Sequence, residues 1–190
     1  MRRKDDFKRD ALFKATVKLV NEIGFVSSSV AKIAKEANVS PATVYIHYKN
    51  KEDLLVSTYI EIKQKMGKAM LTEFNEKLPL KDILRRIWGN AFKYISANPQ
   101  YFQYAEQFAN SPFTDLVDKA EVDKQFTIII QAIQKGKDQK IIKDVHMDLI
   151  NAFIYYPIVV LTNKRITDSV TINDQTIETS FQLAWDAIKL

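Results

Sequence analysis

Residues 27–55 read SSSVAKIAKEANVSPATVYIHYKNKEDLL, and this stretch predicts two short helices joined by a tight turn. Its apolar residues recur at spacings of three and four, which is the period of a helix, and they place the helices at 29–37 and 41–47. Asn38 interrupts the pattern between them, and asparagine tolerates the left-handed backbone that a tight turn needs. The small Ala34 lets the second helix approach the first. The pattern is that of a helix-turn-helix.

The second of these helices has the features of a helix that reads DNA. It begins at Ser40-Pro41, where the serine oxygen can cap a free backbone N–H and proline has no N–H to lose. A helix of this size fits the major groove. Lys49 and Lys51 follow at its exit, where a helix N-terminus also attracts phosphate. The outward positions offer hydroxyls, an imidazole and small apolar groups: Ala42, Thr43, Tyr45, Ile46 and His47.

Charge is concentrated in the same part of the chain. The net charge of the 190 residues is +5. Residues 1–51 hold eleven Lys or Arg and five Asp or Glu, whereas the rest of the chain holds seventeen and eighteen. A basic segment on a near-neutral body is typical of a protein that binds a polyanion. On charge alone, a solvated surface of lysines explains it equally well.

The rest of the chain predicts an all-α fold of about nine helices. Only four glycines and five prolines occur, and no hairpin signal or long alternating strand pattern is present. We expect a three-helix helix-turn-helix head, the DNA-binding domain, at 1–50 and a larger helical bundle for ligand binding and dimerisation at 51–190. Helical periodicity and proline-marked starts predict helices near 5–23, 29–37, 41–47, 51–76, 80–97, 99–109, 112–135, 146–164 and 174–189.

Several classes of protein are disfavoured. The chain has no cysteine, its first residues are charged, and its most apolar run, 153–161, is too short to span a bilayer. We therefore expect a soluble, cytoplasmic protein without a membrane partner. His47 and His146 are far apart in sequence, the glycines stand alone, and no metal-ligand spacing occurs. An enzyme, a cofactor and a metal site are therefore not predicted, although carboxylates alone could still catalyse.

The ordered motifs IAKEANVS, PATVY and HYKNKEDLL resemble the tetracycline-repressor (TetR) family of bacterial transcriptional regulators. The preceding helix, which ends at Gly24-Phe25 before the serines, is similar too. The resemblance covers about the first 55 residues. The sequence departs from the family at Asn38 and Ala42, where glycine is frequent, and both replacements fit the geometry of the motif.

The resemblance implies roles for individual residues of the head. Ser29 and Lys32 would contact phosphate or the groove edge, and Lys51 would be the phosphate lysine of the family motif. Residues 41–43 would face the bases, whereas Tyr45 and His47 would contact the backbone. Residues 2–4, which are basic, would form either an extra DNA-binding arm or a solvated tail. The predicted DNA-contacting set is Ser29, Lys32, Ser40, Pro41, Ala42, Thr43, Tyr45, His47, Lys49 and Lys51.

The body is predicted to dimerise through its last two long helices. The first is apolar nearly all round, which indicates burial on every side. Paired with a second copy, these helices would make a four-helix interface about a two-fold axis. The alternative is that both helices complete the core of the monomer. The predicted interface residues are Phe153, Tyr156, Val160, Phe181, Ala184, Trp185 and Ile188.

Aromatic residues between 88 and 108 suggest a binding site for a small molecule. An apolar pocket with a few polar groups is what such a site needs, although aromatic residues at helical spacing also fill ordinary cores. Glu106 could hold a cationic ligand, or it could pair with Arg85, Arg86 or Lys93. The predicted ligand-binding residues are Trp88, Phe92, Tyr101, Phe102, Tyr104, Glu106 and Phe108.

The leading hypothesis is therefore a homodimeric repressor that binds a palindromic DNA operator and is released by a small, mostly apolar or aromatic effector. The main alternative from a different class is a protein-interaction module or a non-specific nucleoid protein. Preference for one DNA sequence would separate the two, whereas salt dependence would not, because both kinds of protein contact phosphate.

Overall fold

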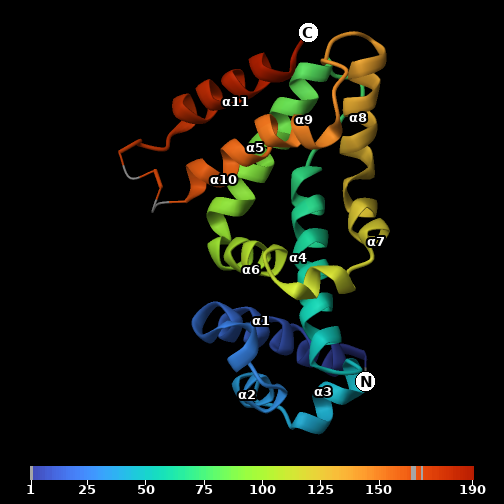
Figure 1. Ribbon diagram of the computed structural model, residues 1–190, viewed down its shortest axis with the longest axis vertical. Helices are drawn as coiled ribbons and strands as arrows, with labels where there is room; N and C mark the ends of the chain where they lie inside the picture. Colours follow the sequence, from blue (N-terminus) through green and yellow to red (C-terminus); the bar gives the residue numbers. More distant parts are fainter. Residues whose placement is uncertain (1, 164–165, 168) are drawn as a thin grey trace. The chain divides into compact units, whose positions relative to one another are not determined.

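A computed structural model describes residues 2–163, 166–167 and 169–190, with the side chains of residues 2–4 excepted. The possible DNA-binding arm at 2–4 therefore lies outside the described side chains. The described residues form helices, and one isolated bridge joins Ile142 to Lys189. The predicted all-α class is confirmed (Figure 1). The helices are α1 (Arg2–Ser27), α2 (Val30–Glu36), α3 (Pro41–His47), α4 (Lys51–Met70), α5 (Leu80–Ala97), α6 (Pro99–Ala109), α7 (Lys119–Asp123), α8 (Thr127–Asp138), α9 (Met147–Ile154), α10 (Tyr156–Thr162) and α11 (Asp174–Ile188), with 3-10 helices η1 (Pro112–Leu116) and η2 (Lys124–Phe126).

The predicted boundaries are right where caps and prolines mark them. The helices predicted at 41–47, 80–97 and 99–109 have the bounds of α3, α5 and α6. The helix predicted at 51–76 begins correctly but ends already at Met70, and two other long predictions are wrong. The helix expected at 112–135 is divided into η1, α7, η2 and α8, and the helix expected at 146–164 breaks at Tyr155 into α9 and α10. Pro157 lies in the first turn of α10 and has no N–H to donate to the turn before it.

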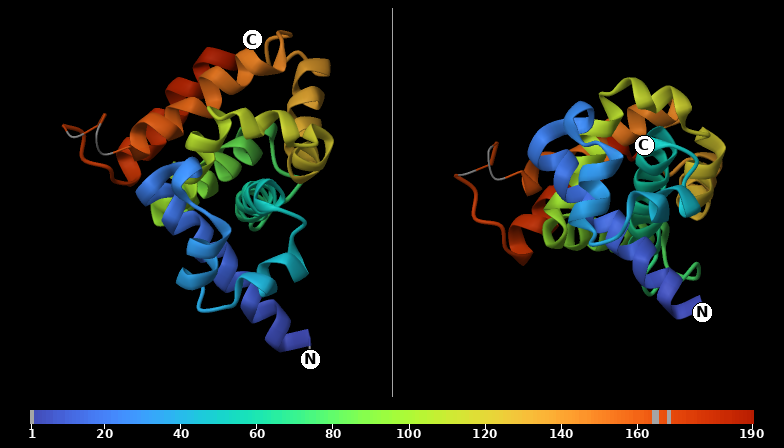
Figure 2. Two further views of the ribbon diagram at one scale, coloured as in Figure 1. Left: turned by 60° about the horizontal axis from the view of Figure 1, so that its bottom comes forward. Right: turned by 90° about the horizontal axis from the view of Figure 1, so that it is seen from below.

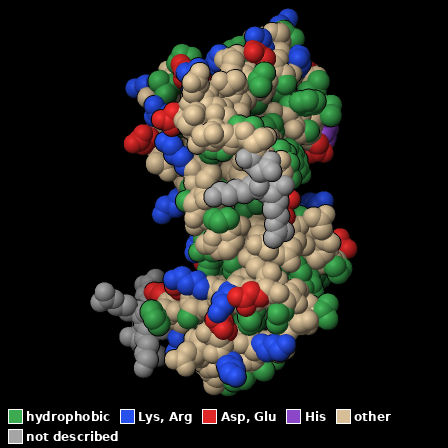
Figure 3. Space-filling view, turned by 90° about the vertical axis from the view of Figure 1, so that its left-hand side faces the viewer, with side chains coloured by type: hydrophobic (Ala, Val, Ile, Leu, Met, Phe, Trp, Pro, Cys, Tyr) green, Lys and Arg blue, Asp and Glu red, His purple; other side chains and the backbone are tan. Residues whose placement is uncertain are grey.

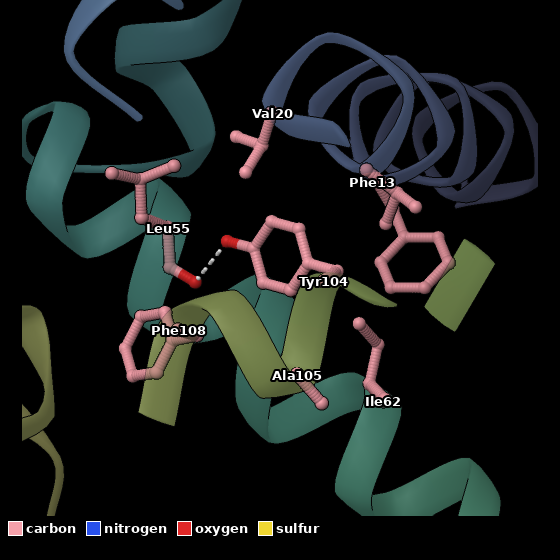
Figure 4. Close-up of a cluster of buried hydrophobic side chains, with 8 residues drawn as sticks. Phe13, Val20, Leu55, Ile62, Tyr104, Ala105 and Phe108 are labelled. Atoms are coloured by element: carbon pink, nitrogen blue, oxygen red, sulfur yellow. Dashed lines mark hydrogen bonds between the residues drawn. The ribbon is translucent and has the colours of Figure 1, made fainter. Parts of the chain in front are cut away.

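The chain folds as two compact units, and the first contains Met1–Gln64 and Asn98–Val122. One of its hydrophobic clusters joins α1, α2, α3 and the start of α4 through buried residues that include Leu12, Ile33, Val44 and Leu54. The second cluster joins α1, α4 and α6 (Figure 4). Phe13 and Val20 enter it from α1, whereas Tyr104 enters from α6. Helix α1 is thus buried on two faces, although Phe7 near its start is exposed.

The second unit contains Lys65–Ala97 and Asp123–Leu190. Helix α5 is its centre, because it packs against both α10 and α11, while α9 packs against α10 and α11. Its apolar face buries seven residues, from Ile83 to Ile95. Gly67 permits a close approach in this unit, since a Cβ there would lie 2.8 Å from the backbone oxygen of Gln125.

The compact units do not follow the predicted functional boundary between residues 50 and 51. The first unit continues along α4 as far as Gln64, and it includes α6. A division by function concerns which residues contact DNA, so the boundary at 50/51 stays a prediction. Among the helices of the described ranges, none is long and apolar enough to cross a membrane.

Candidate nucleic-acid interface

The turn between α2 and α3 is built by local hydrogen bonds. Ser29 caps α2, because its Oγ accepts a hydrogen bond from the backbone N–H of Lys32 at 3.3 Å. Asn38 has a φ of 54°, the left-handed conformation expected from the sequence. The next N–H, of Val39, returns to the carbonyl of Ala34 at 2.9 Å. These bonds set the direction in which α3 leaves, and Figure 2 shows α2 and α3 beside α1 from two further sides.

The cap of α3 uses two side chains that were both predicted to contact DNA. The Oγ of Ser40 accepts from the backbone N–H of Thr43 at 3.2 Å and lies 3.0 Å from the Thr43 hydroxyl. Thr43 is only 9% exposed. Its hydroxyl is therefore occupied by the cap. Less of the Thr43 side chain is accessible to a base than its position in the motif suggests. A direct contact of Thr43 with a base stays a prediction.

The outward face of α3 carries large apolar side chains. Val44 is fully buried against α2, whereas Tyr45 is 57% exposed and Ile46 is 74% exposed. Pro41 and Ala42 are exposed as well. Since burial in the chain does not account for Tyr45 and Ile46, this face is free for a partner. The sequence predicts Ile46 as an outward residue, but the predicted DNA-contacting set does not include it. The helical period places Ile46 on the outward side of α3 together with Tyr45.

His47 lies on a different side of α3 from the exposed residues. Its side chain is 8% exposed, and its Nε2 lies 3.5 Å from the Oδ1 of Asp5. The pair joins the last turn of α3 to the first turns of α1. The structure thus gives His47 a positioning contact that the sequence did not reveal, because Asp5 is 42 positions earlier in the chain. A DNA contact of His47 stays a prediction.

Two predicted phosphate-binding lysines meet at the end of α1. Gly24 has a φ of 75° and disrupts the helical backbone there. The Nζ of Lys32 donates to the carbonyl of Ser27 at 3.1 Å, and the Nζ of Lys51 donates to the carbonyl of Val26 at 3.3 Å. The partial negative charge of a helix C-terminus favours cations. The end of α1 therefore gathers two positive charges from α2 and α4.

These two lysines differ from others of the head in their partners. Lys14 and Lys18 each lie 2.6 Å from a carboxylate oxygen, of Asp10 and Glu36, and these carboxylates raise the pKa of both amines through hydrogen bonding and charge. Within the described ranges, by contrast, no carboxylate lies within 4 Å of the amines of Lys32, Lys49 or Lys51. Figure 3 shows basic side chains next to acidic ones on one face of the molecule. No carboxylate therefore competes with phosphate for the amines of Lys32, Lys49 and Lys51 in the described ranges.

Residues 12–58 match the model described as bacterial regulatory proteins, tetR family, and residues 79–189 match the one described as tetracyclin repressor-like, C-terminal domain. The chain belongs to the TetR family. The first match contains the whole helix-turn-helix, and the second spans more than half of the chain. The protein is therefore a TetR-family DNA-binding transcriptional regulator.

Similar proteins are known in several bacteria. A crystal structure of a TetR-family regulator from Marinobacter aquaeolei VT8 is 35% identical, covers all of this chain and 99% of that one, and has a TM-score of 0.92. An uncharacterised HTH-type transcriptional regulator of Haemophilus influenzae is 30% identical over 108 residues, which are 56% of this chain and 58% of that protein. The regulator FadR of Bacillus subtilis, solved in complex with stearoyl-CoA, is 20% identical, with a TM-score of 0.72 over 94% of this chain and 98% of that one. The match to curated relatives thus spans about half of their length.

The seven predicted ligand-binding residues fall into different compact units of this TetR-family chain. Trp88 and Phe92 belong to the second unit, where Trp88 donates from its indole nitrogen to the carbonyl of Ile154 at 2.7 Å. The other five, from Tyr101 to Phe108, belong to the first. Tyr104 is fully buried, and its hydroxyl donates to the carbonyl of Leu55 at 2.9 Å (Figure 4). Trp88 and Tyr104 thus serve the packing of their units, and ligand contact by any of the seven stays a prediction.

A surface hollow of about 660 Å³ lies in the first unit. Of the seven predicted ligand residues, Glu106 alone lines it in the part of the chain that the structure describes. The end of α1 supplies one wall through Ile23 and Phe25, and Phe113 of η1 lies on another. The sequence did not indicate that these segments come together, since α1 and η1 are separated by almost ninety residues.

The predicted dimer residues divide by exposure. Phe153, Tyr156 and Val160 are all exposed on α9 and α10, and Leu149, which was missed, continues their row. The other four are buried within a single chain, because α11 turns this apolar face towards the core of the second unit, and their contact with a second copy stays a prediction. Those four buried residues are Phe181, Ala184, Trp185 and Ile188.

Proposed function

We propose that this TetR-family protein is a homodimeric repressor that binds a two-fold symmetric operator through α3 and releases it when a small, mostly apolar effector binds. The observation that supports DNA reading by α3 is its exposed Tyr45 and Ile46 beside three lysines without carboxylate partners in the described ranges. In this proposal residues 1–50 contact DNA, and residues 51–190 bind the effector and the second copy.

The α9–α10 row supports the homodimer. Leu149 and Phe153 are four residues apart on α9, Tyr156 and Val160 are four apart on α10, and all four are exposed, so each helix contributes one pair to the row. An exposed apolar row of this kind is typical of a surface that binds a partner. A two-fold dimer would bring two copies of α3 to successive major grooves, about 34–36 Å apart.

Similarity to FadR supports an apolar effector. That protein was solved with stearoyl-CoA, a molecule with a long apolar chain. The fold is shared at 20% identity, so the comparison suggests a class of ligand and identifies no particular molecule. Binding of the effector and binding of DNA would be coupled reciprocally. Operator DNA should weaken effector binding by the same factor by which the effector weakens DNA binding.

Selection of binding sites from randomised duplex DNA tests the operator. At about 0.15 M salt, where charges are screened beyond about 8 Å, the purified protein should enrich one two-fold symmetric sequence. It should bind this sequence roughly a thousandfold more tightly than random DNA. If no sequence is enriched with or without candidate effectors, the protein is a non-specific binder and the proposal is wrong.

Two lysine variants test the assignment of the phosphate contacts. Lys51→Ala should lower the slope of log affinity against log salt by about 0.9, the value for one phosphate contact. Lys18→Ala is the matched control, because Lys18 is already paired with Glu36 and should leave the slope unchanged. Equal slopes for the two variants would contradict the division between paired and available lysines.

Sedimentation velocity tests the dimer. Phe153→Glu should produce monomers, because it places a charge in the exposed apolar row. Leu183→Glu is the control, since Leu183 is also exposed but lies on α11, outside that row. Dimers that persist in Phe153→Glu and dissociate in Leu183→Glu would assign the interface to α11.

A further inference from the structure

Lys63 of α4 is a cation whose charge is poorly compensated. It belongs to the first unit and keeps part of its surface accessible, but burial lowers the pKa of its amine below the ordinary 10.5. Glu106 of α6 opposes that shift by its charge, and no carboxylate lies within 4 Å of the amine in the described part of the chain. Removing a charge from water costs free energy unless a partner replaces the water.

The amine of Lys63 lies over an aromatic ring. Its Nζ is 5.3 Å from the centre of the Tyr59 ring, one turn earlier in α4. Tyr59 in turn stacks on the fully buried Phe108, with ring centres 4.4 Å apart and an angle of 13°. A ring face attracts a cation but accepts none of its hydrogen bonds in the ordinary way. Among the described residues, no hydrogen bond from the three N–H donors of Lys63 to a protein acceptor is formed, so these donors remain for water or a ligand.

Other lysines show what a satisfied amine looks like in this chain. Lys18 has a carboxylate at 2.6 Å, and Lys81 donates to the side-chain oxygen of Gln182 at 2.6 Å. Among the described residues Lys63 has neither kind of partner, and it is less open to water than Lys68, which is exposed on the same helix. An ammonium beside an aromatic stack offers a charged group for an anionic head and an apolar surface for an apolar body.

We propose that Lys63 is the anion-binding group of the effector site, and that the effector is an amphiphile with one carboxylate or phosphate head. Its head lies at the amine of Lys63 and its apolar part lies beside the ring of Tyr59. This inference rests on the proposed function, because it assumes a small, mostly apolar effector. Glu106 does not determine the charge of the ligand, since it lines an open hollow where water reaches its carboxylate.

Three probes with the same chain length test whether the site prefers a negatively charged head. Dodecanoate, dodecyl phosphate and dodecanol are titrated calorimetrically, below the concentrations at which they form micelles. At least one anion should bind wild type roughly tenfold or more tightly than the alcohol, because hydrogen bonds between two charged groups are stronger than those to a neutral hydroxyl. Which anion binds more tightly identifies the head as a carboxylate or a phosphate.

Matched variants assign that preference to Lys63. Lys63→Met should abolish the preference for the anion while the alcohol binds as before, and Lys63→Arg should keep it. Lys68→Met, the control on the exposed side of α4, should behave as wild type. Glu106→Gln should strengthen anion binding, because it removes the nearby negative charge. Lys63→Met should also melt at a higher temperature than wild type without ligand, since an incompletely compensated charge is removed.

The pH dependence gives an independent readout. Since burial lowers the pKa of Lys63, the amine loses its charge at a lower pH than an ordinary lysine does, and the anion preference should fade as pH rises before 10.5 is reached. Anion binding favours the charged amine and should therefore be accompanied by proton uptake in that range.

The failures of this inference and of the proposed function can be distinguished. A wild type without anion preference, or a Lys63→Met variant that keeps it, overturns the role of Lys63. If instead the anion binds through Lys63 but leaves operator affinity unchanged, the site stands and the proposed release of DNA is wrong.

Discussion

Two pairs of short helices, α2–α3 and α9–α10, are joined in opposite ways. The break between α2 and α3 is stabilised by its own residues: Asn38 takes the left-handed conformation and the Ser40 side chain caps the helix that follows. The break between α9 and α10 has no side-chain cap among the described residues. The carbonyl of Ile154 receives its hydrogen bond from Trp88 of α5 instead.

This difference separates a self-contained motif from one that depends on its surroundings. Helices α2 and α3 can present Tyr45 and Ile46 in a fixed direction because local bonds orient them. The exposed row on α9 and α10 depends in addition on a bond from outside the pair, because Trp88 of α5 donates to the carbonyl of Ile154 at the break. A dimer interface built on that row would therefore be sensitive to the position of α5, whereas the DNA-reading surface would not.

The largest expected effect is at Trp88. Trp88→Phe keeps an aromatic ring but removes the indole N–H, so the buried carbonyl of Ile154 loses its donor and a small cavity forms. We expect a loss of about 2–4 kcal/mol in the free energy of unfolding, measured by urea titration. Trp185→Phe is the matched control, because this equally buried indole has no protein acceptor in the described residues and should cost less. Equal losses would show that the bond to Ile154 does not hold the break.

The local cap of α3 should matter less to global stability. Ser40→Ala removes the oxygen that accepts from Thr43, and a lost N-cap costs typically about 1 kcal/mol. Operator affinity should fall more than stability does, since the start of α3 is the part that meets DNA. Ser29→Ala provides the comparison, because it removes the corresponding cap of α2. A loss at Ser40 larger than the loss at Trp88 would reverse the contrast between the two pairs.

The prolines next to the two breaks should each make a small and similar contribution to the free energy of unfolding. Pro41 begins α3 and Pro157 lies in the first turn of α10. Replacing either by alanine mainly increases the freedom of the unfolded chain, which costs about 0.4–1 kcal/mol by thermal unfolding. If Pro157→Ala costs several times more than Pro41→Ala, proline and not Trp88 maintains the break between α9 and α10.

The smallest expected effect is a gain in stability when Asn38 is replaced. Glycine adopts the left-handed conformation without a steric penalty, so Asn38→Gly should stabilise the protein by a few tenths of a kcal/mol. Lys140→Gly should gain more, because Lys140 has a φ of 56° and lysine lacks the local hydrogen bonding that helps asparagine there. Differential scanning calorimetry would resolve the two, and a loss at Asn38 would show that its side chain contributes a bond of its own.

The sequence by itself determined the helical class, the helix-turn-helix and the bounds of α3, α5 and α6. These features depend on interactions that reach only about four residues along the chain: helical periodicity, a serine oxygen on a nearby N–H, and the fixed φ of proline. The outward position of Tyr45 and Ile46 followed for the same reason, because the core face of α3 fixes the opposite face.

The tertiary structure alone decided which distant groups became partners. It paired His47 with Asp5, brought Lys32 and Lys51 to the end of α1, and buried the apolar face of α11 within the chain. Periodicity shows that a face is apolar but not whether its own chain or a second copy covers it. Only the packing of whole helices settles that, because burial depends on which surfaces meet in space.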